Sequence, residues 1–420
     1  MNIWLCNPYG PLPGEAWRET RYAMLGRVLA RRGHNVTWWT AGFSHHSKKL
    51  RSAVAQGVVI EPRFNVQLIP TPCYKRHVGF GRLRFEFFFG LRLYRIGKSS
   101  DRPDVIVSAD ATMAWTHAAL LLARRFRCQI VYDIIDLYPE VFSGVLPGFF
   151  RPHARKIFAP LYALRNLHLK SASAVTAVCD DYLLPARGVR PSIPESKMLT
   201  VFWSTDLDSF HRAEGNSTEI VELSRSHHKQ EDDVFAIYAG TLGLLYDIEA
   251  LLEAARLLRD NQHLKILIAG GGPRSTYIRE FVTKHSLDNI RILGEIGFTE
   301  LIRLYQMCDI GLSLYGVHSP VAMPIKVFDY FAAGLPIVNS IKGFLEQFLR
   351  ERQIGVQYSA GDAKSLAAAL EKLTSNASIR REMAKRTRDV AGEFDSDLQY
   401  GRFASLLEHL HVPPLHMVSP

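Results

Sequence analysis

The stretch SPVAMPIKVFDYFAAGLPIV, residues 319–338, places one base, Lys326, and one acid, Asp329, in an apolar helix that runs into a β-branched strand. Pro324 is expected to start this helix, because proline is tolerated in the first turn, where the backbone amides have no partner. A helix followed directly by a buried strand is part of a βαβ unit. The stretch therefore predicts an α/β fold and raises the question of what its two charged residues bind.

The alternation of strand and helix occurs in two series along the 420 residues. Strands are expected at residues 2–6, 35–40, 104–109, 129–135, 173–178, 234–243 and 265–273, with later ones in RILGEI, CDIGLSL and LPIVNS. Two such series predict two doubly wound parallel sheets, with ligands bound between the carboxyl ends of the strands, in a cleft between two domains. The polar stretch 211–233 is expected to be a surface linker between the domains.

Basic residues are concentrated in the first half of the chain. The net charge is +10, and residues 1–200 hold 28 Lys+Arg and 13 Asp+Glu, a balance of +15, which leaves −5 for the remainder. Five scattered cysteines show no metal or disulfide spacing, and no stretch of about 18 apolar residues is present. We therefore expect a cytoplasmic protein without a bound metal.

The segment 74–100 is typical of a helix that lies in a membrane interface. Apolar residues recur at helical spacing, namely Phe80, Leu83, Phe87, Leu91 and Tyr94, and basic residues lie between them, namely Arg82, Arg84, Arg92, Arg95 and Lys98. A second basic helix is expected from Ala154. The alternative is an internal helix whose arginines lie along its stem. The first interpretation predicts a peripheral protein at the inner face of the plasma membrane, where the basic half contacts anionic lipid.

Glycine- and proline-rich loops follow the first strand of each series. Neither NPYGPLPGE nor AGTLGLLYD matches the GxGxxG pattern of a dinucleotide site, so an NAD enzyme is not expected. Such loops nevertheless let amides approach a phosphate at a helix N-terminus, an arrangement that favours an anion by about 0.3–1 kcal/mol.

Lys326 and Asp329 complement such a phosphate site. Lys326 can add a charge-assisted contact to a diphosphate, and the Asp329 carboxylate can accept both hydroxyls of a ribose diol. The alternative is an i,i+3 ion pair on a solvated face, worth about 0.2–0.5 kcal/mol.

Acidic residues cluster where strands of the N-terminal half end. YDIIDLYPE contains Asp133, Asp136 and Glu140, and Asp110 and His117 follow the previous strand. Any of them can accept a proton from a hydroxyl nucleophile within hydrogen-bond reach. In the competing interpretation these residues cap turns or pair with arginines.

A DxD sequence, Asp206-Leu207-Asp208, occurs just before the polar stretch. Its context favours a surface connection over a metal site.

Taken together, these residues resemble the family 4 glycosyltransferases of the GT-B fold, particularly bacterial enzymes that build surface polysaccharides. The matching pieces occur in the family's order from residue 1 to about residue 410: GPLPGEAWRETRY, RRGHNVTWWTAGFSH, IIDLYPE, WSTDLDSFH, YAGTLGLL, LIAGGGP, RILGEI, IKVFDYFAAGLPIV and FDSDLQYGRFASLL.

The resemblance implies two Rossmann-like domains that face each other across a cleft. Residues 1–205 would bind the acceptor, residues 206–393 would bind a nucleoside-diphosphate sugar, and residues 394–420 would cross back as a helix onto the first domain. It also implies retention of anomeric configuration with no metal or other cofactor. The acceptor would be a glycan linked to polyprenyl diphosphate, and nucleic acid is not an expected partner.

The resemblance also assigns site residues. Asp329 would bind the ribose, amides around Met323 and Ile325 would bind the diphosphate, and the backbone after RILGEI would touch the base. The expected donor residues are Gly240, Thr241, Gly243, Gly271, Gly272, Pro273, Ile296, Met323, Pro324, Ile325, Lys326 and Asp329. Asp136, Asp110 and His117 are the candidate catalytic residues, and Gly10, Gly14, Glu15 and Arg18 are expected on the acceptor side.

Two departures from the family pattern concern charge. Val321 stands where the family often has a second acid, and Thr241 and Tyr246 stand where it often has an arginine and a lysine. Lys326, or else Arg18 and Arg21, would have to replace the missing positive charge. Two alternatives to a transferase remain, namely a nucleotide-sugar 2-epimerase of the same fold and a catalytically silent nucleotide-sugar-binding protein.

Overall fold

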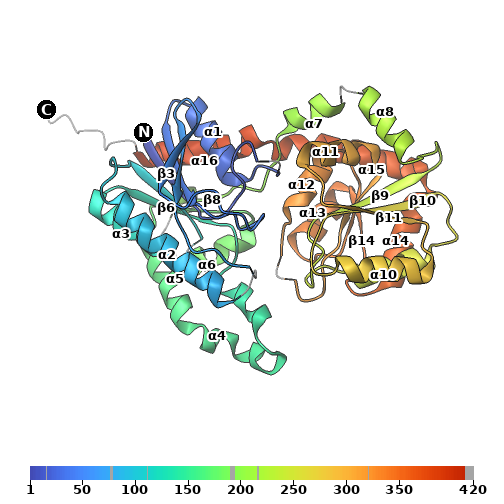
Figure 1. Cartoon of the computed structure of the whole chain (residues 1–420), viewed down its shortest axis with the longest axis horizontal. Helices are drawn as coiled ribbons and strands as arrows, with labels where there is room; N and C mark the ends of the chain where they lie inside the picture. Colours follow the sequence, from blue (N-terminus) through green and yellow to red (C-terminus); the bar gives the residue numbers. More distant parts are fainter. Residues whose placement is uncertain are drawn as a thin grey trace. The chain divides into compact units, whose positions relative to one another are not determined.

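The computed structural model describes residues 1–15, 17–75, 79–110, 112–189, 194–214, 217–319 and 321–411 (Figure 1). The chain forms two compact units, Met1–Phe202 with Asp397–Pro420, and Trp203–Ser396. We call them the N-terminal unit and the C-terminal unit. The two observed boundaries lie within three residues of the positions expected from the sequence. Pro320, within the opening stretch, and residues 412–420 lie outside the described residues.

The N-terminal unit is built around an eight-stranded sheet in the order β3-β4-β2-β1-β5-β6-β7-β8. Its strands are β1 (Asn2–Cys6), β2 (Asn35–Ala41), β3 (Gln56–Glu61), β4 (Phe64–Ile69), β5 (Val105–Ala109), β6 (Gln129–Ile134), β7 (Ala174–Ala177) and β8 (Met198–Thr200). All neighbours pair in parallel except β3, which pairs antiparallel with β4. The expectation of a wholly parallel sheet is therefore wrong at this edge, where a tight β3–β4 hairpin replaces a helical crossover.

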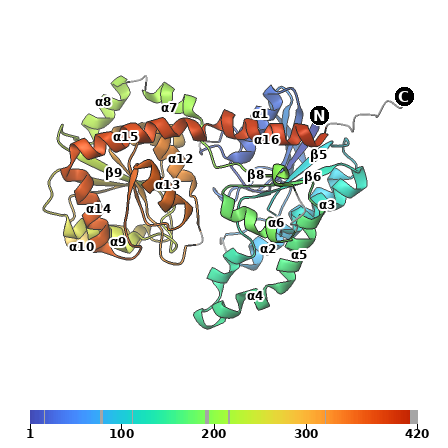
Figure 2. The same cartoon turned by 180° about the vertical axis from the view of Figure 1, so that it is seen from behind.

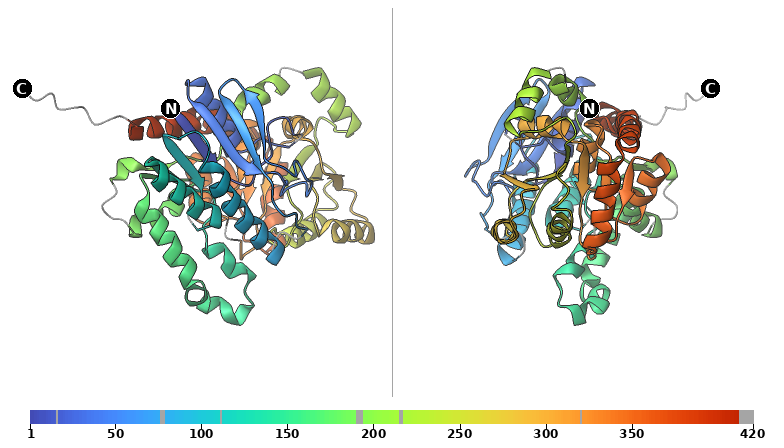
Figure 3. Two further views of the ribbon diagram at one scale, coloured as in Figure 1. Left: turned by 60° about the vertical axis from the view of Figure 1, so that its left-hand side comes forward. Right: turned by 90° about the vertical axis from the view of Figure 1, so that its right-hand side faces the viewer.

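Helices cover both faces of this sheet (Figures 2 and 3). They are α1 (Arg21–Arg31), α2 (Phe80–Gly97), α3 (Ala114–Phe126), α4 (Ala154–Ile157), α5 (Ala159–Ser171), α6 (Leu184–Val189) and α16 (Ser396–His411), with short 3-10 turns that include η1 (Glu140–Val145) and η2 (Gly148–His153). One core joins α1 and α16 to the strands, and Tyr400, Phe403 and Leu407 of α16 are buried in it. The last helix of the chain is thus an integral part of the N-terminal unit.

Helix α2 presents two different faces. Phe80, Leu83 and Phe87 are exposed on one side, and Phe80 retains 81% of its accessible surface. On the other side Arg82 donates to the Glu86 carboxylate, and Arg92 donates to the carbonyl of Pro70. Two of the five arginine and lysine residues assigned to a lipid-facing surface therefore bind within the protein, so the expected basic stripe is smaller than the sequence suggests.

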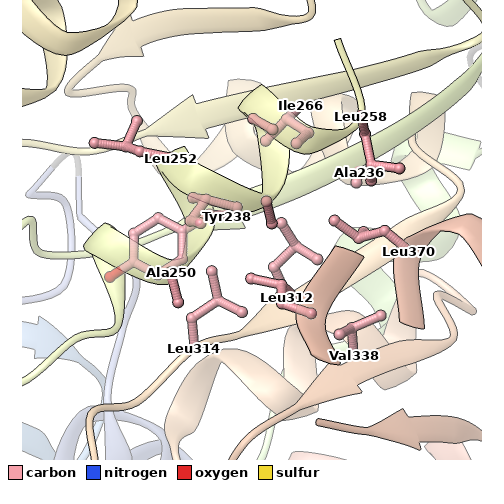
Figure 4. Close-up of a cluster of buried hydrophobic side chains, with 14 of the residues drawn as sticks. Ala236, Tyr238, Ala250, Leu252, Leu258, Ile266, Leu312, Leu314, Val338 and Leu370 are labelled. Carbon is pink, nitrogen blue, oxygen red and sulfur yellow. The ribbon is translucent and has the colours of Figure 1, made fainter. Parts of the chain in front are cut away.

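The C-terminal unit is a parallel six-stranded sheet in the order β11-β10-β9-β12-β13-β14. Its strands are β9 (Val234–Ala239), β10 (Leu264–Ala269), β11 (Ile290–Gly294), β12 (Ile310–Ser313), β13 (Ile337–Asn339) and β14 (Gly355–Gln357). Its helices are α7 (Leu207–Glu214), α8 (Ser217–Ser226), α9 (Ile248–Leu257), α10 (Ser275–His285), α11 (Phe298–Met307), α12 (Ile325–Ala332), α13 (Phe344–Arg352), α14 (Ala363–Ser375) and α15 (Ala377–Ala391). Figure 4 shows part of the buried cluster between the sheet and α9 and α14.

The expected surface linker at 211–233 is wrong for most of its length. Its described residues belong largely to α7 and α8, which pack against α11. Phe210 stacks on Tyr305 of α11, which explains why so polar a segment folds as a helix.

A buried ion pair joins α1 to β6 in the N-terminal unit. Arg21 and Asp133 are almost fully buried, and two hydrogen bonds of 2.7 Å connect the guanidinium to both carboxylate oxygens. Thr176 donates to the same carboxylate, and Arg21 also donates to the carbonyl of Val201. Both charges are thus fully satisfied inside the core.

We predict that Arg21→Met lowers the free energy of unfolding of the N-terminal unit by about 3–5 kcal/mol, because it leaves Asp133 buried without its partner. Five of the six tryptophans lie in this unit, so urea denaturation followed by tryptophan fluorescence reports on it. Arg31→Met in the same helix is the matched control, since Arg31 pairs with Asp397 on the surface and its loss should cost less than about 1 kcal/mol. Equal losses in both variants would contradict the role given to the buried pair.

Candidate active site

Two glycine loops meet at the carboxyl edge of the C-terminal sheet, one after β9 and one after β10. A side chain at Gly270 would place its Cβ 1.9 Å from the carbonyl oxygen of Gly240, and one at Gly272 would lie 2.5 Å from that of Leu242. Both glycines also have positive φ angles, of 144° and 154°. Only glycine permits this close approach of the two backbones.

Some of the amides expected to bind phosphate are used within these loops. Gly240 donates to the carbonyl of Ala269, Leu242 donates to that of Gly271, and Gly272 donates to the hydroxyl of Ser275. The glycines therefore fix the shape of the two loops, and direct contacts from Gly240, Gly271 and Gly272 to a nucleotide remain predictions.

The other expected donor residues lie at the ends of neighbouring strands of the same sheet. Thr241 and Gly243 follow β9, Pro273 follows β10, Ile296 follows β11, and Met323 and Pro324 precede α12. Helix α12 begins at Ile325, and no side chain caps it. The Val327 amide donates to the carbonyl of Pro324, which leaves the amides of Ile325 and Lys326 to bind an anion.

Lys326, in the first turn of α12, is the most unusual residue at this edge. It is only 7% exposed, and its Nζ has no hydrogen-bond partner among the described residues. Three tyrosine rings surround it, with centroids 4.1 Å (Tyr238), 5.0 Å (Tyr246) and 5.4 Å (Tyr315) from Nζ. We call these rings the tyrosine cage. Nζ also lies 2.9 Å from the point where a Cβ on Gly240 would stand, so the glycine makes room for the ammonium.

Burial lowers the pKa of Lys326 to about 7. A cation–π contact with each ring offsets part of the lost hydration, but no carboxylate or carbonyl accepts a hydrogen bond from Nζ in the described residues. The tyrosines themselves stay neutral, because burial raises the pKa of each. An ammonium in this setting would be stabilised strongly by an anion.

Lys326 lies close to the positions at which the sequence lacks the expected basic residues. Its Nζ contacts the ring of Tyr246 and lies against Gly240, the residue before Thr241. One cation from α12 thus stands beside both positions where the family often carries basic residues. The alternative cation Arg21 is excluded, because its guanidinium is committed to Asp133 in the core of the other unit.

Asp329 lies one turn after Lys326 and is 2% exposed. Its Oδ1 accepts a hydrogen bond of 3.0 Å from the hydroxyl of Thr205. The carboxylate therefore already binds a hydroxyl donor, as it would have to do with a ribose. Contact with the ribose itself remains a prediction and requires Thr205 to move or to share the carboxylate. The sequence alternative, a solvated Lys326–Asp329 pair, is excluded by the burial of both residues.

A cavity of about 290 Å³ opens at the carboxyl ends of β12, β13 and β14. Tyr315 of the tyrosine cage lines it, together with Val321, Ser340 and Lys342. The position at which the family often has a second acid thus faces this cavity with an apolar side chain.

In the N-terminal unit, Asp110 and Asp136 come together at the ends of β5 and β6. Oδ1 of Asp110 accepts the backbone amides of Ile135 and Asp136, each at 3.0 Å. Asp110 also has a left-handed backbone with φ 57°, a strained conformation for a residue other than glycine. Burial and the neighbouring Asp136 carboxylate raise the pKa of Asp110. The arrangement suits Asp110 to hold the loop and leaves the more exposed Asp136 to interact with a substrate.

The other acids and the histidine of this region have different partners. Asp133 pairs with Arg21, and Glu140 pairs with Arg165 at 2.7 Å, as the competing interpretation of the sequence held. His117 lies in α3, and its Nδ1 is 3.2 Å from Nε2 of the buried His168 in α5. The structure therefore brings Asp110 and Asp136 together and directs His117 to a contact between helices.

The expected acceptor-side residues lie in a loop that is held by Arg51. Arg51 donates to both carboxylate oxygens of Glu15 at 2.8 Å and to the carbonyl of Gly10 at 2.9 Å. Glu15 is thus a structural anchor for the loop that contains Gly14. Arg18 is partly exposed and donates to the carbonyl of Glu19.

The DxD sequence lies at the start of α7. The Asp206 carboxylate accepts from the hydroxyl of Ser209 and lies 3.6 Å from Arg212. These contacts tie Asp206 to side chains of α7. In the part of the chain that the structure describes, no three His, Cys, Asp or Glu residues are grouped as metal ligands.

No sequence pattern predicts the tyrosine cage. Tyr238 ends β9, Tyr246 precedes α9, and Tyr315 follows β12, so their only common signal was a position near the carboxyl end of a strand.

Two family descriptions match the two units. The glycosyl transferase 4-like domain matches residues 19–200, and glycosyl transferases group 1 match residues 220–390. The chain therefore belongs to the glycosyltransferase family with these two domains, and the resemblance to family 4 is confirmed.

Curated relatives are distant. An uncharacterized glycosyltransferase of Methanocaldococcus jannaschii is 22% identical over 49% of this chain and 52% of its own length. The O-antigen chain mannosyltransferase C of Escherichia coli is 22% identical over 66% of this chain and 75% of its own length. The chain thus spans about half the length of the first of these relatives.

Solved structures confirm the GT-B fold. The sucrose-phosphate synthase of Thermosynechococcus elongatus superposes with a TM-score of 0.75 at 15% identity, covering 98% of this chain and 99% of that one. HepE of Anabaena in complex with UDP-glucose superposes with a TM-score of 0.69 at 13% identity, covering 97% and 100%.

The burial of Lys326 predicts a pH-dependent stability. Its folded pKa of about 7 lies below the unfolded value, so between pH 7 and about 10.5 the unfolded chain holds a proton that the folded chain lacks. Relative to Lys326→Met, the wild type should gain up to about 1.4 kcal/mol of unfolding free energy per pH unit in this window. Below pH 7 the difference should stay constant.

Urea denaturation followed by circular dichroism at pH 6 to 10 measures this difference. Lys342→Met, at an exposed lysine of the same unit, should show no such dependence. A difference between wild type and Lys326→Met that does not change with pH would contradict the burial of an uncompensated ammonium.

Proposed function

We propose that the chain is a retaining glycosyltransferase that moves a sugar from a nucleoside diphosphate to a lipid-linked glycan acceptor during bacterial surface polysaccharide synthesis. The observation that carries the proposal is the buried Nζ of Lys326, which has no hydrogen-bond partner among the described residues and lies at the start of α12 beside the glycine loop after β9. Family membership and the likeness to the O-antigen chain mannosyltransferase support it.

The donor diphosphate is assigned to the C-terminal unit. Lys326 supplies a full positive charge, and the uncapped first-turn amides of α12 supply a partial one. Hydrogen bonds to charged groups contribute about 1.5–3 kcal/mol each. Asp329 would accept the ribose hydroxyls in place of the Thr205 hydroxyl. The UDP-glucose complex of the Anabaena neighbour is consistent with a donor of this class.

The same charges would act in the chemical step. As the bond between the sugar C1 and the diphosphate oxygen breaks, negative charge grows on the leaving diphosphate and positive charge grows on the sugar ring. Lys326 and the helix amides favour that leaving group more than the intact donor, which lowers the barrier. We infer that they do so without a metal or other cofactor.

The acceptor hydroxyl forms the new bond to C1, and its proton passes to the departing phosphate oxygen. In this scheme Asp136 orients the hydroxyl, and Asp110 holds the loop that carries Asp136. The acceptor is assigned to the N-terminal unit.

A membrane-facing surface on the N-terminal unit supports a lipid-linked acceptor. Besides the exposed face of α2, the segment η2–α4 exposes the apolar Phe149, Phe150 and Ile157 together with the basic Arg151, Arg155 and Lys156. Figures 1 and 2 place α4 at the outer end of α5. Apolar side chains beside cations suit the interface of an anionic bilayer. Among the described helices, none could span a bilayer.

Nucleotide binding tests the donor assignment. We expect UDP or GDP to raise the melting temperature of the wild type. Lys326→Met should lower the affinity for that nucleotide about tenfold or more, because a charge-assisted contact is lost. The corresponding nucleoside should bind both proteins equally. Lys385→Met, at an exposed lysine of α15, is the control, and a variant at Lys326 that binds the diphosphate as tightly as wild type would refute the assignment.

Donor turnover separates the transferase from its alternatives. We expect slow donor hydrolysis by the wild type, its loss in Asp329→Ala and its retention in Lys385→Met, a change at an exposed lysine of α15. Binding without any turnover would favour a silent binding protein, and release of a 2-epimer would favour an epimerase.

Vesicle binding tests the membrane surface. We expect the protein to sediment with phosphatidylglycerol vesicles more than with phosphatidylcholine vesicles, and Phe149→Ser to reduce that binding severalfold. Val59→Ser is the control, because Val59 is also apolar, is similarly exposed at 76% and lies in the same unit. Equal affinity for neutral and anionic vesicles would contradict the proposed surface.

A further inference from the structure

Aromatic and basic side chains converge at the carboxyl edge of the N-terminal sheet. Tyr9 follows β1, His45 and Lys48 follow β2, Tyr74 follows β4, and Arg82 lies in the first turn of α2. We call these five residues the basic-aromatic cluster. The rings of Tyr9 and Phe85 stack at 5.8 Å, and Tyr74 contacts Phe85 at 5.1 Å, so the cluster rests on the core of the unit.

The cluster lies at the topological switch point of the sheet. Strand β1 pairs with β2 on one side and with β5 on the other. From β1 and β5, the later strands of the two halves are therefore added in opposite directions across the sheet. Ligands of open α/β sheets bind outside the carboxyl ends of the strands at this point. Tyr9 and Asp110 follow the two strands that flank it.

Arg82 is fixed at the centre of the cluster. Its Nε donates to Glu86 at 2.8 Å and to the hydroxyl of Tyr9 at 3.2 Å, and its Nη2 donates to the hydroxyl of Tyr138 at 3.1 Å. Its side chain still retains 23% of its accessible surface. These contacts hold a partly exposed guanidinium in one orientation beside the loop of Asp136.

Lys48 brings a second cation to the same place. Its Nζ lies 4.5 Å from the ring centroid of Tyr74, and its backbone is left-handed with φ 57°. Burial and repulsion from Arg82 lower the pKa of Lys48 to about 8. Glu86 is the carboxylate bound to Arg82, and its Oε1 also accepts from Tyr9. Two mutually repelling cations held in this way would be stabilised by a bound anion.

We propose that Lys48 and Arg82 bind a phosphoryl group of the acceptor, so that the acceptor hydroxyl reaches Asp136. The inference rests on the proposed function, because it assigns the acceptor that function requires. The location supports a lipid-linked phosphate in particular. Arg82 projects from the inner face of α2, while Phe80, Leu83 and Phe87 project from the outer face of the same helix turns.

Calorimetric titration with farnesyl diphosphate, farnesol and inorganic pyrophosphate tests the site. The measurement is made in the Lys326→Met background, so that the donor site of the other unit does not contribute. The test variant is Lys48→Asn, because asparagine tolerates the left-handed backbone. Its matched control is Lys49→Asn, which removes the same charge from the exposed neighbouring lysine.

We expect Lys48→Asn to lower the affinity for farnesyl diphosphate about tenfold and Lys49→Asn to leave that affinity unchanged. Farnesol should bind weakly and equally to all proteins, and pyrophosphate should bind less tightly than farnesyl diphosphate. Equal affinity of the two asparagine variants for farnesyl diphosphate would overturn the site. Pyrophosphate binding that depends on Lys48 but gains nothing from the farnesyl chain would overturn the lipid-linked acceptor.

The result is independent of the donor assignment. If nucleotide binding depends on Lys326 but farnesyl diphosphate binding does not depend on Lys48, only the acceptor site is refuted. The converse would refute only the donor site at Lys326.

Discussion

The burial of Lys326, whose ammonium form finds no hydrogen-bond partner among the described residues, is the constraint on which the C-terminal unit depends. Burying such a charge costs several kcal/mol, and the tyrosine cage around Lys326 offsets only part of that cost. Gly240 must lack a side chain for Nζ to fit, and α12 must begin at Ile325 for Lys326 to reach the loop after β9. The arrangement is explained if an anion completes it.

In the N-terminal unit, by contrast with Lys326, the buried charged side chains have hydrogen-bond partners. Arg21 and Asp133 satisfy each other in the core and contribute to the fold, whereas Asp110 uses its carboxylate to hold the loop of Asp136. Residues bound to each other in a buried ion pair are not available to bind or react with a substrate. The residues available to a substrate are therefore Asp136 and the partly exposed cations of the basic-aromatic cluster, Lys48 and Arg82.

The sequence predicted most strands and the helix after Pro324, because buried parallel strands and proline-started helices have strong local signals. It could not predict the tyrosine cage, since Tyr238 and Tyr315 are far apart in the chain and meet only in the folded sheet. Nor could it tell that Arg82 turns inward from α2, because helical spacing does not show which face packs. The polar composition of α7 and α8 similarly concealed two helices that are stabilised by packing on α11.

The central claim is that the donor diphosphate binds the charged form of Lys326, whose pKa burial lowers to about 7 in the free protein. Calorimetry of nucleoside diphosphate binding at pH 8, in two buffers with different ionisation enthalpies, measures this directly, because the ligand is fully ionised at that pH. The account predicts uptake of close to one proton by the wild type and of none by Lys326→Met. Tight binding of the nucleoside diphosphate to the wild type without any proton uptake would contradict it.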